Sequence, residues 1–233
     1  SVGGLSAEDL YNHLRQFEGP DQGAKVVEFL VNHAALPATR AIARRILPTI
    51  RKNAPGFQIV DGPSALLETN MMNSFGQYDS VENFVSIRGI GITGKHLSGL
   101  DEETILHEFI HAATSIFIQE NPNSPAVKNL ISVSQDVRAG LLELVLEQEA
   151  TTEVINIFDQ PITIAGGGPY RRLLNKWEKY YGTPLEFIAW SLSSQSFQRM
   201  LQAIEITPKT SLWNKFTRLI AKMFGITAED ETG

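Results

Sequence analysis

Apolar residues recur at helical spacing over the first part of the chain. The segments 7–17, 23–33 and 39–51 each carry apolar side chains three or four positions apart, which is typical of amphipathic helices. Gly19-Pro20 is expected to end the first helix, and Pro48 to shorten or kink the third. The pattern therefore predicts a lobe of short helices at the start of the chain.

Two short segments have the pattern of strands. Residues 57–60 form a short β-type run that Asp61-Gly62-Pro63 closes with a turn signal, and residues 83–88 alternate between apolar and polar side chains. Beyond them, residues 101–120 are apolar almost all round, with Asp101 as the expected N-cap and Glu102 and Glu103 in the first turn. Such a helix is expected to be buried, so polar groups inside it need partners.

The later segments are predicted to be mostly helical. Helices are expected over residues 126–158, 170–181, 184–204 and 211–224, with the last one amphipathic and packed on the core. The predicted fold class is α+β, mostly α-helical, with a small mixed sheet. The predicted division is an N-terminal helical lobe over residues 1–55, a domain over 56–206, and a C-terminal helix over 207–233.

The buried helix contains the motif His-Glu-x-x-His at His107, Glu108 and His111. Residues four apart lie on one face of a helix, so the two imidazoles can bind one metal ion. Glu108 lies about 100° further round the helix, where its carboxylate can take a proton from a water molecule beside the metal. This arrangement is typical of one class of zinc peptidases, those with a zincin-like fold. The alternative is a pair of ordinary histidines beside a solvated glutamate.

In zinc peptidases an edge strand just before this helix binds the substrate by adding it to the sheet. Residues 85–92 are the candidate for that strand, since glycines there would let a backbone approach closely. The expected substrate-binding residues are Ile87, Gly89, Ile90 and Gly91. A plain structural hairpin is the alternative.

A catalytic zinc site needs a third protein ligand. The chain has no cysteine and five histidines, and none of the other three lies six residues after His111, where an extended motif would place it. A carboxylate from a later helix is therefore expected, and two candidates remain open. One is Glu186, which could instead form a capping box with Thr183. The other is an acidic run that could instead be a solvated helix face: Glu143, Glu147, Glu149 and Glu153.

Several short motifs resemble a zincin family that includes anthrax lethal factor and the metallopeptidase-like domains of large polyvalent proteins from phages and mobile elements. The similar blocks are Leu106-His107-Glu108-Phe109-Ile110-His111-Ala112-Ala113-Thr114, then Tyr180-Tyr181-Gly182-Thr183-Pro184-Leu185-Glu186-Phe187-Ile188-Ala189, then Phe197-Gln198. The resemblance spans roughly residues 84–224, through motifs rather than continuous similarity.

The resemblance implies a role for individual residues. It makes Glu186 the third zinc ligand, and it makes Tyr180 or Tyr181 the residue that stabilises the oxyanion. The family's second glutamate, which supports a zinc-binding histidine, falls on Trp190, and an indole cannot accept a hydrogen bond from that histidine. Glu149 or Glu153 is the expected substitute.

Charge and hydropathy exclude several classes of protein. A net charge of −6 argues against a nucleic-acid-binding protein, and no apolar run is long enough for a membrane-spanning helix. No signal peptide is visible, so the expected location is the cytoplasm of a host cell or a virion. The chain begins at Ser1 without a methionine, which is typical of a fragment, and the resemblance implies a larger polyprotein or virion assembly.

The expected function is therefore a zinc-dependent metallopeptidase of the gluzincin type, with Zn²⁺ as cofactor and a protein or peptide as substrate. Two alternatives remain. A degenerate zincin would bind zinc and serve as a binding or virion-structural module, and Trp190 is the reason to consider it. A helical interaction domain would hold no metal.

Overall fold

The structure is a computed structural model of the 233-residue chain. It describes residues 5–62, 71, 75–89, 98–150, 154–157, 160–163, 171, 174–175, 177–178, 184–193, 201, 205–207 and 210–211. The chain divides into a first unit, Ser1–Pro122 with Ile188–Ser194, and a second unit, Asn123–Phe187 with Gln195–Gly233. In this division the N-terminal helices and the sheet belong to the same unit.

The helices of the first unit agree with the apolar pattern of the sequence. They are α1 (Ala7–Leu14), the short 3₁₀ helix η1 (Arg15–Phe17), α2 (Gly23–His33), α3 (Pro37–Asn53) and α5 (Glu102–Glu120). Asp101 is the N-cap of α5, and its carboxylate accepts a hydrogen bond of 2.7 Å from the backbone N–H of Thr104. Pro48 lies inside α3 without ending it. The predicted helices are therefore confirmed to within a few residues.

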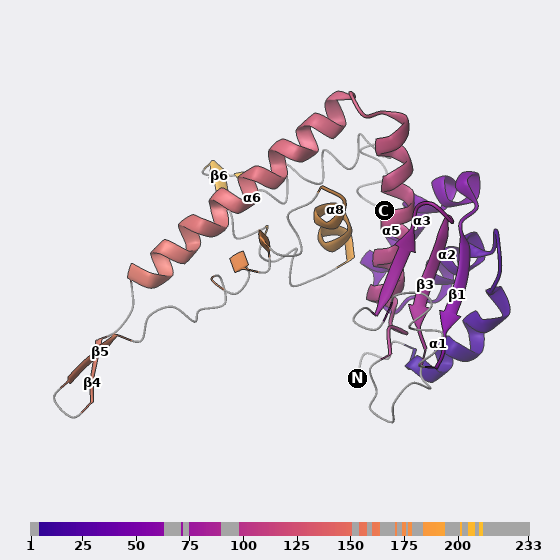
Figure 1. Cartoon of the computed structure of the whole chain (residues 1–233), viewed down its shortest axis with the longest axis horizontal. Coiled ribbons are helices and arrows are strands. Elements are labelled where there is room, and N and C mark those ends of the chain that lie inside the picture. The colour runs from indigo at the N-terminus through magenta and orange to yellow at the C-terminus, as the bar shows by residue number, and fades with distance from the viewer. Residues whose placement is uncertain are drawn as a thin grey trace. The chain divides into compact units, whose positions relative to one another are not determined.

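Three strands form a small mixed sheet in the first unit (Figure 1). Strands β1 (Gly56–Val60), β2 (Gly76–Asp79) and β3 (Phe84–Arg88) lie in the order β1-β3-β2. Strand β3 pairs parallel with β1 and antiparallel with β2. The prediction that the strand beginning near residue 85 is an edge strand is therefore wrong. Ile87 lies opposite Ile59 on one side and Gly76 on the other, so it cannot pair with a substrate strand.

The outer edge of β1 already has hydrogen-bond partners in the chain. Gly19 and Phe57 exchange backbone hydrogen bonds of 2.8 and 3.1 Å. The N–H of Ile59 donates to the carboxylate of Glu18 at 2.7 Å. Among the described strands of this sheet, β2 is therefore the edge at which a further strand can be added.

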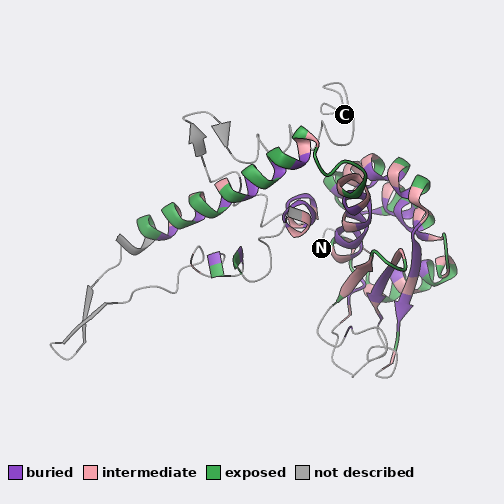
Figure 2. Cartoon of the chain, turned by 45° about the horizontal axis from the view of Figure 1, so that its top comes forward, coloured by how far each residue is buried: buried purple, intermediate pink, exposed green. Residues whose placement is uncertain are grey.

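The core of the first unit lies between the sheet and its helices. Helix α5 packs against β2, β3 and α3, and α2 packs against β1 and α3. The rings of Phe57 and Phe109 stack at 6.2 Å and join β1 to α5. Figure 2 shows buried residues along α5 and along the strands. Within α5, all of the residues from 105 to 110 are buried. This explains why the α5 sequence is apolar on nearly all sides.

The described elements of the second unit include one long helix, α6 (Pro125–Ala150). Two hairpins accompany it, β4 (Val154–Ile157) with β5 (Gln160–Thr163), and β6 (Glu205–Thr207) with β7 (Thr210–Ser211). The long helix was expected to continue to residue 158, and Ser211 was expected to begin a helix, so both predictions are wrong at those positions. Most of the expected final helix lies outside the described residues.

The fold class is α+β, mostly helical, with a small mixed three-stranded sheet, as the sequence predicted. Helix α8 (Pro184–Ser193) confirms the first part of the helix expected over residues 184–204, and its residues from Ile188 onwards belong to the first unit. Within the part of the chain that is described, none of the helices combines the length and apolar character needed to cross a membrane.

Candidate metal centre

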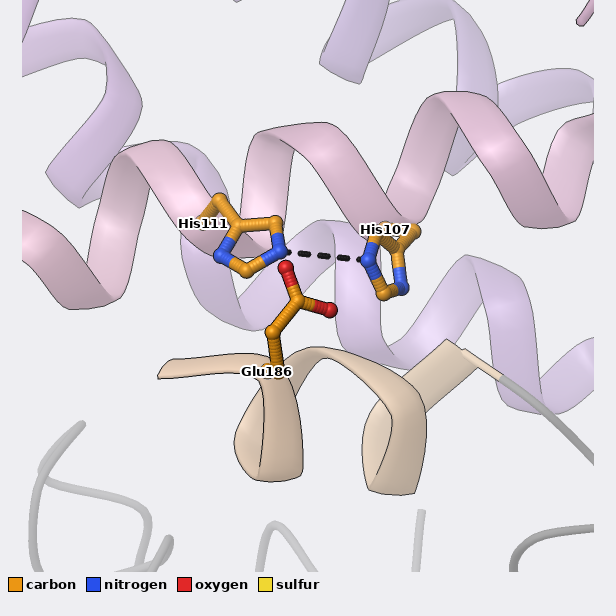
Figure 3. A group of neighbouring side chains, drawn as sticks. All are labelled: His107, His111 and Glu186. Carbon is orange, nitrogen blue, oxygen red and sulfur yellow. Dashed lines mark hydrogen bonds between the residues drawn. The ribbon is translucent and has the colours of Figure 1, made fainter. Parts of the chain in front are cut away.

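Helix α5 places the two motif histidines on the same face, one turn apart. The Nε2 atoms of His107 and His111 lie 3.1 Å from each other (Figure 3). Their rings meet edge to face, with centroids 4.7 Å apart and an interplanar angle of 78°. The spacing of four residues therefore places both imidazoles on one face of the helix, as predicted, with a nitrogen of each directed to the same point.

Glu186 supplies a third ligand atom at this point. It lies in the first turn of α8, and its carboxylate and the two imidazoles offer ligand atoms that all lie within 4.8 Å of one another (Figure 3). Of the other candidates, Glu143 and Glu147 are exposed on α6 and are not part of the group. The side chains of Glu149 and Glu153 lie outside the described residues, as do Tyr180 and Tyr181.

The three residues fit a divalent metal ion. Two zinc–nitrogen bonds of about 2.0–2.1 Å in tetrahedral geometry place their nitrogens about 3.3 Å apart, close to the 3.1 Å between the histidines. Two neutral imidazoles and one carboxylate are also a donor set that leaves a fourth position for water or substrate. The group His107, His111 and Glu186 is therefore placed to hold a metal ion.

Glu108 directly follows His107 on α5 and is buried, with its side chain against the edge strand of the sheet. A Cβ atom built on Gly76 of β2 would lie 3.0 Å from Cγ of Glu108 and 3.3 Å from Cγ2 of Thr104. The absence of a side chain at Gly76 thus lets β2 lie directly on the part of α5 that carries Glu108. The edge strand beside the motif is β2, and its sequence Gly-Gln-Tyr-Asp has no strand-like alternation that would have predicted it.

The structure describes two of the four residues predicted to bind substrate, and neither lies at a free edge of the sheet. Ile87 lies in the central strand of the sheet, with a strand paired on each side. The N–H of Gly89, just after this strand, donates to the carbonyl of Val60 at 3.0 Å, so it is also bonded within the protein. A Cβ atom built on Gly89 would overlap the carboxylate of Asp61 and lie 2.9 Å from Cγ2 of Ile59, so these side chains would have to move to admit a larger residue. Ile90 and Gly91 lie outside the described residues.

Two further side chains of α8 lie against His107. The indole of Trp190 meets the imidazole edge to face, with centroids 4.6 Å apart, and Oγ of Ser193 lies 3.2 Å from Nδ1 of His107. Ser193 was not predicted from the sequence. Its position seven residues after Glu186, on the same face of one helix, is the signal that could have indicated it.

Comparison of the chain with protein-family models, with curated proteins and with solved structures found no match. The resemblance to zincins therefore stays a prediction from short motifs, and the chemistry of this centre is argued from its own residues.

Proposed function

We propose that the protein is a zinc-dependent peptidase of the gluzincin type. The observation that carries the proposal is the convergence of His107, His111 and Glu186, whose ligand atoms lie within 4.8 Å of one another. The buried Glu108 follows His107 on the same helix. Two histidines and a glutamate are the ligands of one class of catalytic zinc site in peptidases. Glu186 follows His111 by 75 positions, so the fold of the chain, and not the geometry of one helix, brings its carboxylate to the two imidazoles.

In the proposed hydrolysis, different residues of the protein have different roles. A zinc ion at these ligands would supply Lewis acidity to a water molecule and to the scissile carbonyl. Glu108 accepts the proton of the attacking water and delivers it to the departing amine nitrogen, as a general base and then a general acid. Tyr180 or Tyr181 remains the proposed oxyanion-stabilising residue.

Strand β2 is the element we propose for binding the substrate backbone, in place of the strand expected from the sequence. The N–H of Arg88 donates to the carbonyl of Phe75 at 2.8 Å, which fixes the phase of the β2–β3 pairing. In an antiparallel pair the backbone groups of alternate residues then turn outwards, and here these residues are Gly76 and Tyr78. An extended peptide that pairs with them would lie beside Glu108.

The first test measures zinc and turnover in the same set of variants. The parent chain should contain one zinc ion per chain by elemental analysis, and Glu186→Ala should lose it because two histidines alone bind zinc weakly. Glu143→Ala is the matched control, since it removes an exposed glutamate that is outside the group. If Glu186→Ala retained its zinc, the third ligand would have to be another residue.

The same experiment follows cleavage of an unstructured polypeptide and of a peptide library. Glu108→Gln should keep its zinc and lose turnover by at least a hundredfold, because an amide cannot take the proton that a carboxylate takes. Cleavage by Glu108→Gln at the parent's rate would overturn the proposed mechanism. No zinc in the parent after incubation with excess metal would overturn the metal site.

One observation favours a second function, that of a zinc-binding module without peptidase activity. Trp190 occupies the position at which the resembling family has an acidic residue, and its ring lies against His107. A parent chain that holds zinc tightly and cleaves nothing in the library would support this second function over the first.

A further inference from the structure

The two nitrogens of the His107 ring have different surroundings. Nε2 faces His111 at 3.1 Å, on the side of the metal group, whereas Nδ1 lies 3.2 Å from Oγ of Ser193. A histidine binds a metal ion through a nitrogen that carries no hydrogen, so its other nitrogen must carry the hydrogen and donate it. The partner of Nδ1 therefore decides how well this ring is prepared for a metal.

The direction of the Ser193 hydrogen bond follows from its second partner. The hydroxyl of Ser193 donates to the carbonyl of Ala189, one turn earlier in α8, at 2.6 Å. A hydroxyl has a single hydrogen, so Oγ is left to accept from Nδ1–H of His107. The Ala189 carbonyl thus fixes the hydroxyl, and the hydroxyl in turn selects the tautomer that leaves the lone pair on Nε2.

Trp190 complements Ser193 without replacing it. Its ring lies 4.6 Å from the imidazole at an angle of 61°, which restricts rotation of His107, but an indole offers no acceptor for Nδ1–H. Glu186, Trp190 and Ser193 follow one another at spacings of four and three, so they share one face of α8. One helix thereby supplies both a ligand and the groups that orient another ligand.

We propose that Ser193 is the positioning residue for His107, and that its hydroxyl takes the role of the acidic residue whose place Trp190 occupies. The proposal rests on the metal site of the proposed function, and it concerns metal affinity rather than the cleavage step. A neutral hydroxyl polarises the imidazole less than a carboxylate does, so Ser193 acts mainly by fixing the tautomer and the orientation of the ring.

The test measures zinc affinity by competition with a chromogenic chelator, in the full chain. Ser193→Ala should weaken zinc binding by about ten- to a hundredfold, the range found when the partner of a metal-binding histidine is removed. Ser193→Thr keeps a hydroxyl that can bond the same carbonyl, and it should restore most of the affinity. Ser134→Ala is the matched control, because Ser134 is also a helical serine bonded to its own helix, at Ile131, and it is not in the metal group.

A second readout needs no metal. In metal-free protein with neutral histidines, the ¹⁵N chemical shifts of the His107 ring should report hydrogen on Nδ1 in the parent and in Ser193→Thr, and a smaller share of that tautomer in Ser193→Ala. Equal zinc affinity and equal tautomer populations in the parent and Ser193→Ala would overturn this inference and leave the proposed function standing. A parent that binds no zinc would overturn both.

Discussion

Gly76 is the residue through which the edge strand and the metal-binding helix make their closest approach. Gly76→Ala would place a methyl group 3.0 Å from Cγ of Glu108 and from Cδ1 of Ile87, so one of these side chains must move. We expect zinc content to stay at the parent's level and the turnover number to fall by about ten- to a hundredfold, since small misplacement of a catalytic group has effects of this size. Elemental analysis and peptide cleavage measure the two quantities.

A second-site change provides the control for this prediction. Ile87→Val removes the Cδ1 atom that confines residue 76, so the double variant should recover part of the lost turnover. A Gly76→Ala variant as active as the parent would show that Glu108 does not depend on the close approach of β2.

The residues that the sequence revealed are those whose chemistry is rare and whose spacing is fixed. His107 and His111 follow from the helical repeat, and Glu186 was one of two open candidates until α8 brought it to the histidines. Ser193 and Gly76 were missed for a physical reason. A serine or a glycine has many ordinary uses, and only the fold shows that one contacts His107 and the other lies against Glu108.

At the scale of elements, the turn between β2 and β3 depends on Asn83. This residue has a left-handed backbone with φ of +54°, accepts a hydrogen bond from the Tyr78 hydroxyl at 2.8 Å, and donates one to the Asn53 carbonyl at 2.8 Å. Burial, and then the neighbouring charge of Asp79, raise the pKa of Tyr78, so its hydroxyl remains a donor through neutral pH. Asn83 thus joins the edge strand to the end of α3.

Two substitutions of Asn83 should separate the contributions of its backbone conformation and of its side-chain hydrogen bonds to the free energy of unfolding. Asn83→Ala loses both hydrogen bonds and disfavours the left-handed backbone, so the free energy of unfolding should fall by about 1–3 kcal/mol. Asn83→Gly loses only the hydrogen bonds and should be destabilised less, because glycine adopts this conformation without strain. Denaturant unfolding measures both, and equal stability of the two variants would argue against the backbone contribution.

Helices with a strong apolar repeat and a recognisable cap were predictable as elements, whereas strand order was not. Asp101 and the block from residue 105 to 110 define α5 locally. The order β1-β3-β2 depends on contacts between distant segments, so the pattern of β3 alone could not show that β2 would cover its side. The hairpin β4–β5 replaced the expected end of the long helix for a different reason: the apolar residues Val154, Ile155 and Ile157 are β-branched and suit a strand at least as well as a helix.

At the scale of the whole molecule, metal binding should raise the stability of the folded chain. An ion that binds only the folded protein, at a hundred times its dissociation constant, adds about 2.7 kcal/mol to the free energy of unfolding. We therefore expect Zn²⁺ to raise the Tm of the parent and a chelator to reverse the change. His111→Ala should show no such shift, whereas Glu143→Ala should respond as the parent does; a similar shift in His111→Ala would indicate binding elsewhere.

The hydrogen bonds that Glu18 and Gly19 make along β1 also have a consequence for self-association. A sheet with two unpaired edges can pair edge to edge with further copies of itself without limit and form fibrils. A sheet with only one unpaired edge forms a dimer at most, because that edge is covered once two copies have paired. The short connection after η1 therefore restricts the described sheet to a single added strand. That strand can come from a peptide or from a second molecule, and at high protein concentration these two compete for the same side of β2.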